Sequence, residues 1–242
     1  MSTNNEIVIA FDLYGTLLST ESVAGQLAEY FGQEKAQSIA TLWRRYQLEY
    51  TWRLNNIYQP FSTVTRSSLQ HALADFSLTL PQEATDSVMR AYDALSAFPD
   101  VVPALKSLSS RSNILPVIFS NGTHSMVSNS IHHSRDLEPL SAIFEKIVTV
   151  EEVKKFKPAP EVYRYLAEQV GRADSMDEVW IVSSNPFDIV GARRVGMKGC
   201  WVDRQRSGWK DGLLEGLEGR PTVTVQGIEE VFDAVLNHEV EG

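Results

Sequence analysis

Cysteine is almost missing from this sequence, since Cys200 is the only one among 242 residues. A single cysteine cannot form a disulfide within the chain, which favours a reducing compartment. Long apolar runs are also missing, and none approaches the roughly 20 residues that a membrane-spanning helix needs. Residues 1–6 are too short and polar for a signal peptide. The sequence therefore predicts a cytoplasmic protein with no membrane partner.

Positive charge is scarce as well. The chain has 22 Lys and Arg against 31 Asp and Glu, which gives a formal net charge of −9. This balance argues against a nucleic-acid partner and against binding to an anionic membrane surface. An anionic substrate would have to be bound by local basic groups. None of the five histidines has a partner at the spacing of metal ligands, so we expect no metal site through them.

The first apolar stretch, residues 7–11, has the pattern of a strand that is buried on both faces. It leads into Asp12, a glycine turn at Gly15 and the hydroxyl of Thr16. This order places Asp12 at the carboxyl end of a strand, where open α/β sheets bind their ligands. A carboxylate in that position can be a metal ligand, a general base or a nucleophile.

The chain after this strand changes character twice. Residues 21–95 show no alternation of strands and helices, and their patterns predict helices over 21–31, 34–55, 65–76 and 81–95. From Phe98 the alternation returns, with strands expected over 116–120, 146–150, 179–183, 199–203 and 222–225. Pro116 is acceptable there only as the first residue of its strand.

These elements predict an α/β fold with a Rossmann-like, doubly wound, mostly parallel sheet. Residues 1–17 together with 97–242 would form the core domain, and residues 18–96 a helical cap domain inserted after the first strand. An insertion at that point lies over the carboxyl ends of the strands and can close the site.

Four predicted loops leave the carboxyl ends of strands, and each carries polar side chains. They are residues 12–16, Ser120-Asn121-Gly122, Lys157-Pro158 and residues 183–188. Each loop alone is a weak signal, because Ser-Asn-Gly is a common turn and a strand-end Asp is often a helix N-cap. Their joint occurrence in this order indicates an active site.

With these loops the chain resembles the haloacid dehalogenase superfamily, which combines a strand-end nucleophilic Asp, a Ser or Thr, a Lys and a final acidic loop. Most members are phosphatases with an Asp-x-Asp first loop and further acids that hold Mg²⁺. Here Tyr14 replaces the second Asp, and Asp188 is the only acid of the last loop. Mg²⁺ prefers carboxylate oxygens, and phosphoryl transfer relies on its charge. The residues therefore predict a metal-independent reaction.

Longer motifs resemble the L-2-haloacid dehalogenase branch, over about residues 7–204. They are DLYGTL (12–17), LWRRYQLEYTW (42–52), KPAPEVY (157–163) and SSNPFD (183–188). The resemblance implies hydrolysis of a short L-2-haloacid to a D-2-hydroxy acid and halide, without a cofactor. It also implies a homodimer formed through the helical regions. Phe187 stands where this branch usually has Trp, which keeps an aromatic wall but changes its shape.

The same resemblance implies a role for each polar residue. Asp12 would attack the substrate and form an ester, and Lys157 would keep it ionised. Arg44 from the cap and Asn121 would receive the halide. The substrate carboxylate would bind Ser120 and the backbone N–H groups near Leu13 and Tyr14. The residues expected to orient Lys157, Asp12 and the hydrolytic water are Thr16, Ser183, Asn185 and Asp188, and those expected in the pocket wall are Tyr14, Tyr163 and Phe187.

Two alternatives to a dehalogenase stay open at this point, besides an enzyme of this branch whose natural substrate is not halogenated. A phosphatase or phosphonatase of the same superfamily would need Mg²⁺ for turnover. A non-catalytic protein with this fold would bind a small carboxylate without converting it. The joint presence of Asp12, Lys157 and Asp188 argues against the second alternative.

Overall fold

The computed structural model describes residues 6–108, 110–214, 216 and 219–241. Within these residues the strands form one six-stranded sheet of order β3-β2-β1-β4-β5-β6, in which every strand pair is parallel. The strands are β1 (Ile7–Phe11), β2 (Ile114–Ser120), β3 (Lys146–Thr149), β4 (Val179–Ser183), β5 (Lys198–Val202) and β6 (Val223–Val225). The strand order reverses at β1, so Asp12 follows the strand at the topological switch point.

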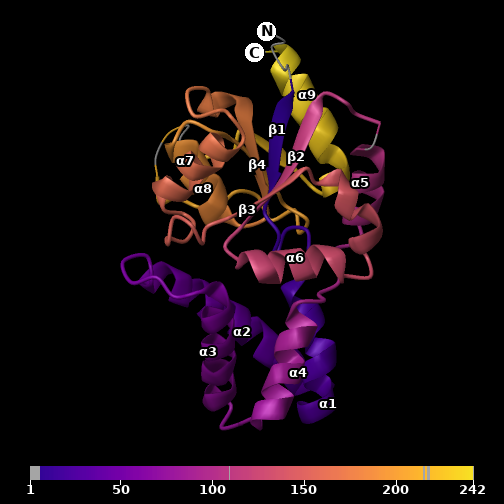
Figure 1. Cartoon of the computed structure of the whole chain (residues 1–242), viewed down its shortest axis with the longest axis vertical. Coiled ribbons are helices and arrows are strands. Elements are labelled where there is room, and N and C mark those ends of the chain that lie inside the picture. The colour runs from indigo at the N-terminus through magenta and orange to yellow at the C-terminus, as the bar shows by residue number, and fades with distance from the viewer. Residues whose placement is uncertain (1–5, 109, 215, 217–218, 242) are drawn as a thin grey trace.

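Helices cover both faces of the sheet, which explains the uninterrupted apolar runs of its strands. Figure 1 shows α7 (Pro160–Gln169) and α8 (Pro186–Arg194) on one side, with α5 (Val101–Leu108) and α9 (Val231–Glu241) on the other. The central strands β1 and β4 are almost wholly buried between them. One more helix of the α/β part of the chain, α6 (His124–His132), follows β2. The α/β fold class expected from the sequence is confirmed.

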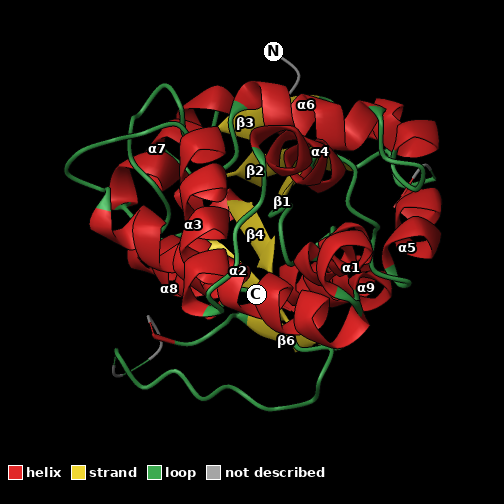
Figure 2. Ribbon diagram, turned by 90° about the horizontal axis from the view of Figure 1, so that it is seen from below, coloured by secondary structure: helices red, strands yellow, loops and turns green. Residues whose placement is uncertain are grey.

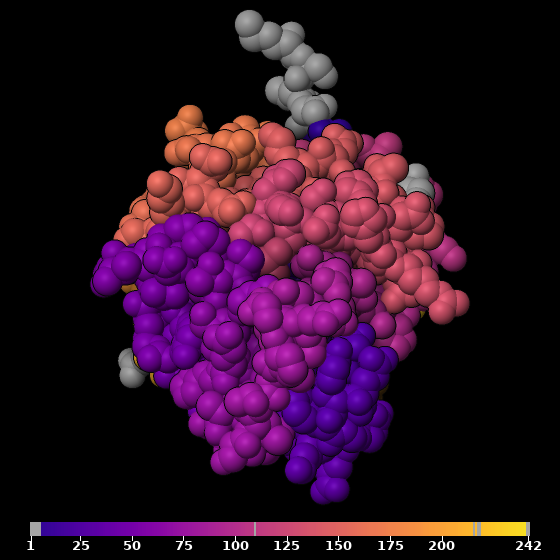
Figure 3. All heavy atoms as spheres, turned by 60° about the horizontal axis from the view of Figure 1, so that its bottom comes forward, coloured from indigo at the N-terminus to yellow at the C-terminus, as the bar shows by residue number. Residues whose placement is uncertain are grey.

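A short 3₁₀ helix (Thr20–Val23) and four α-helices separate β1 from α5 in the chain. The four α-helices are α1 (Ala24–Phe31), α2 (Gln33–Arg53), α3 (Phe61–Asp75) and α4 (Gln82–Tyr92). They lie together beyond the carboxyl ends of the strands (Figure 1), and the view from that side shows strands between the helices (Figure 2). With all atoms drawn, this helical insertion covers that end of the molecule (Figure 3). Among the described helices, none combines the length and the apolar character that crossing a membrane requires.

The two segments that enter and leave the helical insertion run side by side. Ser19 N donates to Ser96 O (2.9 Å) and Phe98 N donates to Leu17 O (3.0 Å). Within the insertion, the indole N–H of Trp43 on α2 donates to Thr65 O on α3 (2.8 Å). The first two bonds hold the ends of the insertion together, and the third ties α2 to α3.

Several boundaries differ from the expectations, among them the starts of β2 and α3. The strand β2 begins at Ile114, so Pro116 lies inside it rather than at its first residue. The carbonyl of Pro116 accepts from Glu145 N, just before β3, and β3 pairs with β2 only from Val117 onward. The missing N–H of Pro116 thus faces the side where β3 has not yet begun, and no ladder bond is lost. The helix α3 begins at Phe61 rather than at residue 65, directly after Pro60.

Candidate active site

Side chains from three strand ends and from two helices of the insertion enclose a pocket beside Asp12. Its lining consists of Asp12, Tyr14, Arg44, Leu48, Phe61, Ser120, Asn121, Asn185 and Phe187. The cavity volume is only about 10 Å³, which is room for about one water molecule. Trp52 of α2 packs edge-on against Phe187, with ring centroids 5.9 Å apart. A larger molecule therefore enters only if the insertion or these side chains move.

The Asp12 carboxylate is held by donors of different kinds at its two oxygens. Oδ2 accepts from Thr16 Oγ1 and from Asn185 Nδ2, both at 2.8 Å. Oδ1 accepts from the ammonium group of Lys157 at 3.2 Å. Two donors occupy the two in-plane lone pairs of Oδ2, whereas Oδ1 receives one donor among the described residues. Oδ1 is therefore the oxygen with a lone pair left for chemistry.

Lys157 lies under this carboxylate and is almost fully buried, with 1% of its surface exposed. Its Nζ donates to Asp12 Oδ1, to Asp188 Oδ2 (2.8 Å) and to Phe119 O (2.8 Å). The ammonium group also lies 4.0 Å from the centre of the Phe119 ring. All three of its N–H donors are thus directed, and one cation serves two buried carboxylates.

Asp188 has no exposed surface. Burial raises the pKa of its carboxyl above the ordinary value, while Lys157 and the hydroxyl of Tyr163 act in the opposite direction. The Tyr163 hydroxyl donates to Asp188 Oδ1 at 2.8 Å. Tyr163 was expected in the pocket wall. It lies outside the lining, and its hydroxyl contacts the Asp188 carboxylate instead.

Two pocket residues have their donors oriented by the backbone. Ser120 Oγ accepts from Gly122 N (3.1 Å), which leaves its hydroxyl hydrogen for another acceptor. Asn121 Oδ1 accepts from Lys157 N (2.9 Å), so the amide end that remains is its Nδ2 donor. Both side chains line the pocket. The pocket wall at this point consists of hydrogen-bond donors, as recognition of an anion requires.

Arg44 reaches the pocket from α2. Its Nη2 donates to Tyr14 O (2.9 Å), and its Nη1 donates to Gln47 Oε1 (2.7 Å). Gly15 lies directly beneath, with φ +90°. A Cβ atom there would lie 3.5 Å from Arg44 Nη2 and 3.7 Å from the Asn185 amide, and the positive φ itself favours glycine.

Six of the expected site residues lie next to the pocket rather than in its lining. They are Lys157, Asp188 and Tyr163, described above, together with Ser183, Thr16 and Leu13. Ser183 Oγ accepts from Asn185 N (3.1 Å), and Thr16 Oγ1 accepts from Ser184 N (3.0 Å) while donating to Asp12. The side chain of Leu13 is fully buried in the core. Ser183 thus holds the loop that carries Asn185, and Thr16 joins that loop to the one that carries Asp12.

The sequence did not point to several residues that the structure brings to the site. Leu48 lines the pocket four residues after Arg44, so the helical spacing of α2 was an available signal. Phe61 gave no such signal, because nothing in the sequence relates it to Asp12.

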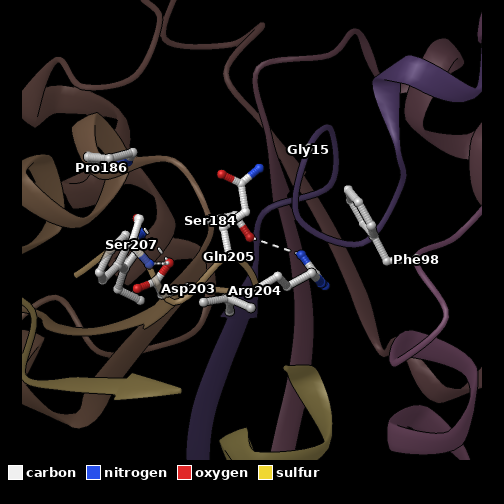
Figure 4. Close-up of a pocket in the computed structure, with 10 residues that line it drawn as sticks. Gly15, Phe98, Ser184, Pro186, Asp203, Arg204, Gln205 and Ser207 are labelled. Atoms are coloured by element: carbon white, nitrogen blue, oxygen red, sulfur yellow. Dashed lines mark hydrogen bonds between the residues drawn. The ribbon is translucent and has the colours of Figure 1, made fainter. Parts of the chain in front are cut away.

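Arg204 was also not foreseen, and it borders a second cavity of about 340 Å³, which Gly15 of the Asp12 loop also lines (Figure 4). Its guanidinium donates to Ser184 Oγ (3.0 Å), to Thr16 O (2.8 Å) and to Asp100 (3.0 Å). This arginine therefore braces the loop that carries Thr16. None of the pocket residues expected from the sequence lines this larger cavity.

The donor set does not suit Mg²⁺. Lys157 Nζ lies between Asp12 and Asp188, at 3.2 Å and 2.8 Å from their carboxylates. An ammonium group thus occupies the space between the two acids where a metal ion would be needed. Within the described ranges, no group of three or more His, Cys, Asp or Glu side chains is arranged to hold a metal ion.

Comparison with known proteins places this site in a family. Residues 8–196 match the family model of haloacid dehalogenase-like hydrolases. The chain is 35% identical to (S)-2-haloacid dehalogenase H-109 of Pseudomonas putida, over 95% of this chain and 97% of that one. It is 32% identical to haloacetate dehalogenase H-2 of Moraxella sp. (strain B), over 81% and 85% of the two chains.

A solved structure agrees with this assignment. L-2-haloacid dehalogenase from Xanthobacter autotrophicus, with chloropropionic acid covalently bound, superimposes with a TM-score of 0.82 at 25% identity. The match covers 96% of this chain and 98% of that one. On the length and identity of these matches, the chain belongs to the haloacid dehalogenase-like hydrolases.

Proposed function

We propose that this protein hydrolyses short L-2-haloacids to D-2-hydroxy acids and halide, through an ester formed on Asp12. The observation that carries the proposal is a buried, ionisable carboxylate that faces donors from Arg44, Ser120 and Asn121, with Lys157 in the place of a metal. The (S)-2-haloacid dehalogenases among its relatives support the same reaction. The covalent chloropropionic acid complex of the Xanthobacter enzyme supports an ester intermediate.

The first step is displacement of the halide at C2 of the substrate. Asp12 Oδ1, which keeps an unused lone pair, forms the new C–O bond, and the electron pair of the carbon–halogen bond leaves with the halide. Arg44 and the Nδ2 donor of Asn121 receive that anion. The Ser120 hydroxyl and the backbone N–H groups near Leu13 and Tyr14 bind the substrate carboxylate. Attack in line with the breaking bond inverts C2.

The second step is hydrolysis of the ester. Water adds to the carboxyl carbon of Asp12, and negative charge develops on the ester carbonyl oxygen, which is Oδ2. The donors at that oxygen, Thr16 Oγ1 and Asn185 Nδ2, are already in place at 2.8 Å, as in an oxyanion hole. The bond from the carboxyl carbon to Oδ1 then breaks, and Oδ1 leaves as the hydroxyl oxygen of the product. One proton of the water passes to that oxygen and the other is released.

Halide release is the test of this function. The purified protein is incubated with a panel of L- and D-2-haloacids, with and without excess chelator, and with a phosphate ester as the control substrate. We expect halide from the L-isomers, no change with chelator, and no phosphate. Turnover that collapses with chelator, or release of phosphate, would assign the protein to the Mg²⁺-dependent alternative. Binding of 2-haloacids without halide release would make it a non-catalytic carboxylate-binding protein.

The acid limb of the pH profile depends on Asp188. Its ionised form holds Lys157, and the hydroxyl of Tyr163 lowers the pKa of this carboxyl, which burial has raised. Replacing Tyr163 with phenylalanine removes that hydrogen bond, so the pKa rises further and activity is lost at a higher pH on the acid side. The kcat/KM profile for halide release, compared with Tyr165→Phe on the same helix, measures the shift. An acid limb that does not move would show that Asp188 does not control it.

The cap-domain boundaries also form part of the proposal. We place the cap at residues 18–96 and the core at residues 1–17 and 97–242, because the paired segments at Ser19 and Phe98 join the two parts. The cavity of about 10 Å³ would then be the closed state, and substrate would enter when the cap swings open.

A homodimer is proposed on the outer aromatic side chains of α2 and α3, where Tyr46 stacks on His71 with ring centroids 3.8 Å apart. Sedimentation equilibrium would then give twice the chain mass of 27.1 kDa, and a mass of 27.1 kDa would exclude the dimer. The lone cysteine supports a cytoplasmic location.

A further inference from the structure

Gln47 lies beneath Arg44, and we propose that it is a positioning residue that keeps the Arg44 guanidinium directed into the pocket. It sits on α2 one turn after Arg44, with only 1% of its surface exposed. Its side chain does not line the pocket. The inference rests on the proposed function, in which Arg44 receives the halide.

A chain of directed hydrogen bonds fixes the orientation of the Gln47 amide. The Thr65 hydroxyl donates to Phe61 O (2.7 Å), so its oxygen is left as an acceptor. Gln47 Nε2 donates to that oxygen at 2.9 Å. The other end of the amide, Oε1, must then face Arg44 Nη1 at 2.7 Å and the Tyr92 hydroxyl at 3.0 Å. The acceptor that Arg44 needs is therefore set by a threonine on another helix.

The surroundings of this network are apolar. Trp43 and Tyr92 pack against each other with ring centroids 5.1 Å apart, and Thr65 and Tyr92 are buried. A leucine or methionine would fill the space of Gln47 and would bring no amide atoms that need hydrogen-bond partners in a buried place. The Gln47 amide supplies the acceptor Oε1 for Arg44 Nη1, which an apolar side chain cannot do.

The partners of Arg44 also divide between the two parts of the molecule. Its Nη2 donates to Tyr14 O on the Asp12 loop and to Asn185 Oδ1 (3.5 Å) after β4, whereas Gln47 belongs to the helical insertion. The partners of Gln47 itself, Thr65 and Tyr92, belong to the insertion as well. When the insertion moves away from the sheet, the bond to Tyr14 is broken but the bond to Gln47 moves with Arg44. Gln47 therefore keeps the long arginine side chain in its binding conformation before the substrate arrives, which lowers the ordering needed during the reaction.

The test compares Gln47→Met with wild type in the first chemical step. Enzyme in excess is mixed with L-2-chloropropionate or L-2-bromopropionate, and the rate of halide release is followed by rapid quench. We expect Gln47→Met to lower the rate with the chloride leaving group by about 10- to 100-fold. The loss should be several-fold smaller with bromide. Chloride is the poorer leaving group, so its departure depends more on the Arg44 guanidinium. Gln37→Met, the same change on the exposed face of α2, should leave both rates unchanged.

Thr65 gives a second variant that does not touch Arg44. Thr65→Val keeps the shape but removes the acceptor of Gln47 Nε2, and it should show the same halide-dependent loss. Thr65→Ser retains the hydroxyl and should restore most of the rate. An equal loss with both halides, or no loss, would overturn the positioning role, since a general weakening of the cap does not distinguish leaving groups.

A crystal structure of Gln47→Met separates this inference from the proposed function. We expect the Arg44 guanidinium to leave its place 2.9 Å from Tyr14 O or to lose defined density. An unmoved guanidinium would overturn the inference even if the enzyme releases halide. If wild type releases no halide, the proposed function fails while this structural readout still decides the role of Gln47.

Discussion

Replacing Asp12 with asparagine is expected to abolish halide release, with a loss of about 10⁴-fold or more, as for other enzymes that lose a covalent nucleophile. The amide nitrogen has no lone pair available for attack on C2, and the amide oxygen is a poor nucleophile. The carboxylate of Asp12 lies in the pocket lining with Lys157 directly below it. Halide release by wild type and variant, under identical conditions, measures the effect.

The fold should survive this substitution. Lys157 bonds two carboxylates, Asp12 and Asp188, so the buried cluster carries one more negative than positive charge when both acids are ionised. Asp12→Asn leaves one cation with one anion, which avoids an unpaired buried charge. We expect an unchanged circular dichroism spectrum and a Tm near that of wild type. Asp174→Asn, at an exposed site, is the matched control, and turnover retained by Asp12→Asn would refute the nucleophile assignment.

Replacing Lys157 with methionine is expected to remove both activity and much of the stability. Two carboxylates then share a buried site without a cation, and breaking a buried pair in this way typically lowers the free energy of unfolding by about 3–5 kcal/mol. Asp12 also loses the ammonium group that donates to its Oδ1. Lys155→Met, which removes an ammonium group from a partly exposed pair with Glu161, should have little effect on either property.

The stability loss of Lys157→Met should depend on pH in a defined direction. Lys157 lowers the pKa of Asp188, which burial raises, so its removal lets that pKa rise further. A carboxyl whose pKa is raised in the folded state stabilises the fold when protonated, and this contribution is lost as pH rises through the raised pKa. The deficit should therefore be largest at neutral pH and shrink toward the ordinary carboxyl pKa of about 4. Urea unfolding at both pH values measures it, and an equal deficit at both would contradict the charge argument.

Much of the fold followed from local pattern. The apolar run before Asp12 predicts a strand buried on both faces, and residues 179–183 predict a second strand. The structure has β1 and β4 there, between two layers of helices. The start of β2 was missed because a proline is normally excluded from a strand interior. Its tolerance at Pro116 depends on where β3 begins, which is a property of the assembled sheet.

The candidate site also contains residues that local pattern predicts and residues whose role depends on the assembled fold. Asp12, Ser120 and Asn185 were found because each lies at or just after the carboxyl end of a strand, and parallel strands bring these ends to one edge. Tyr163 was assigned to the pocket wall on resemblance alone, whereas its hydroxyl binds the buried side of Asp188. Gln47 was not found because its role depends on Thr65, and their contact comes from the packing of α2 on α3. Side chains that act through another side chain leave no local pattern in the sequence.

The direct test of the covalent mechanism is a single turnover in ¹⁸O-labelled water, with enzyme in excess over L-2-chloropropionate. If Asp12 Oδ1 attacks C2 and water then attacks the carboxyl carbon, the first D-2-hydroxy acid carries no label. The label appears instead in the Asp12 carboxylate, where mass spectrometry of the peptide that contains residue 12 detects it. Label in the hydroxy acid on the first turnover, with an unlabelled Asp12, would mean that water attacks C2 directly and would contradict the account.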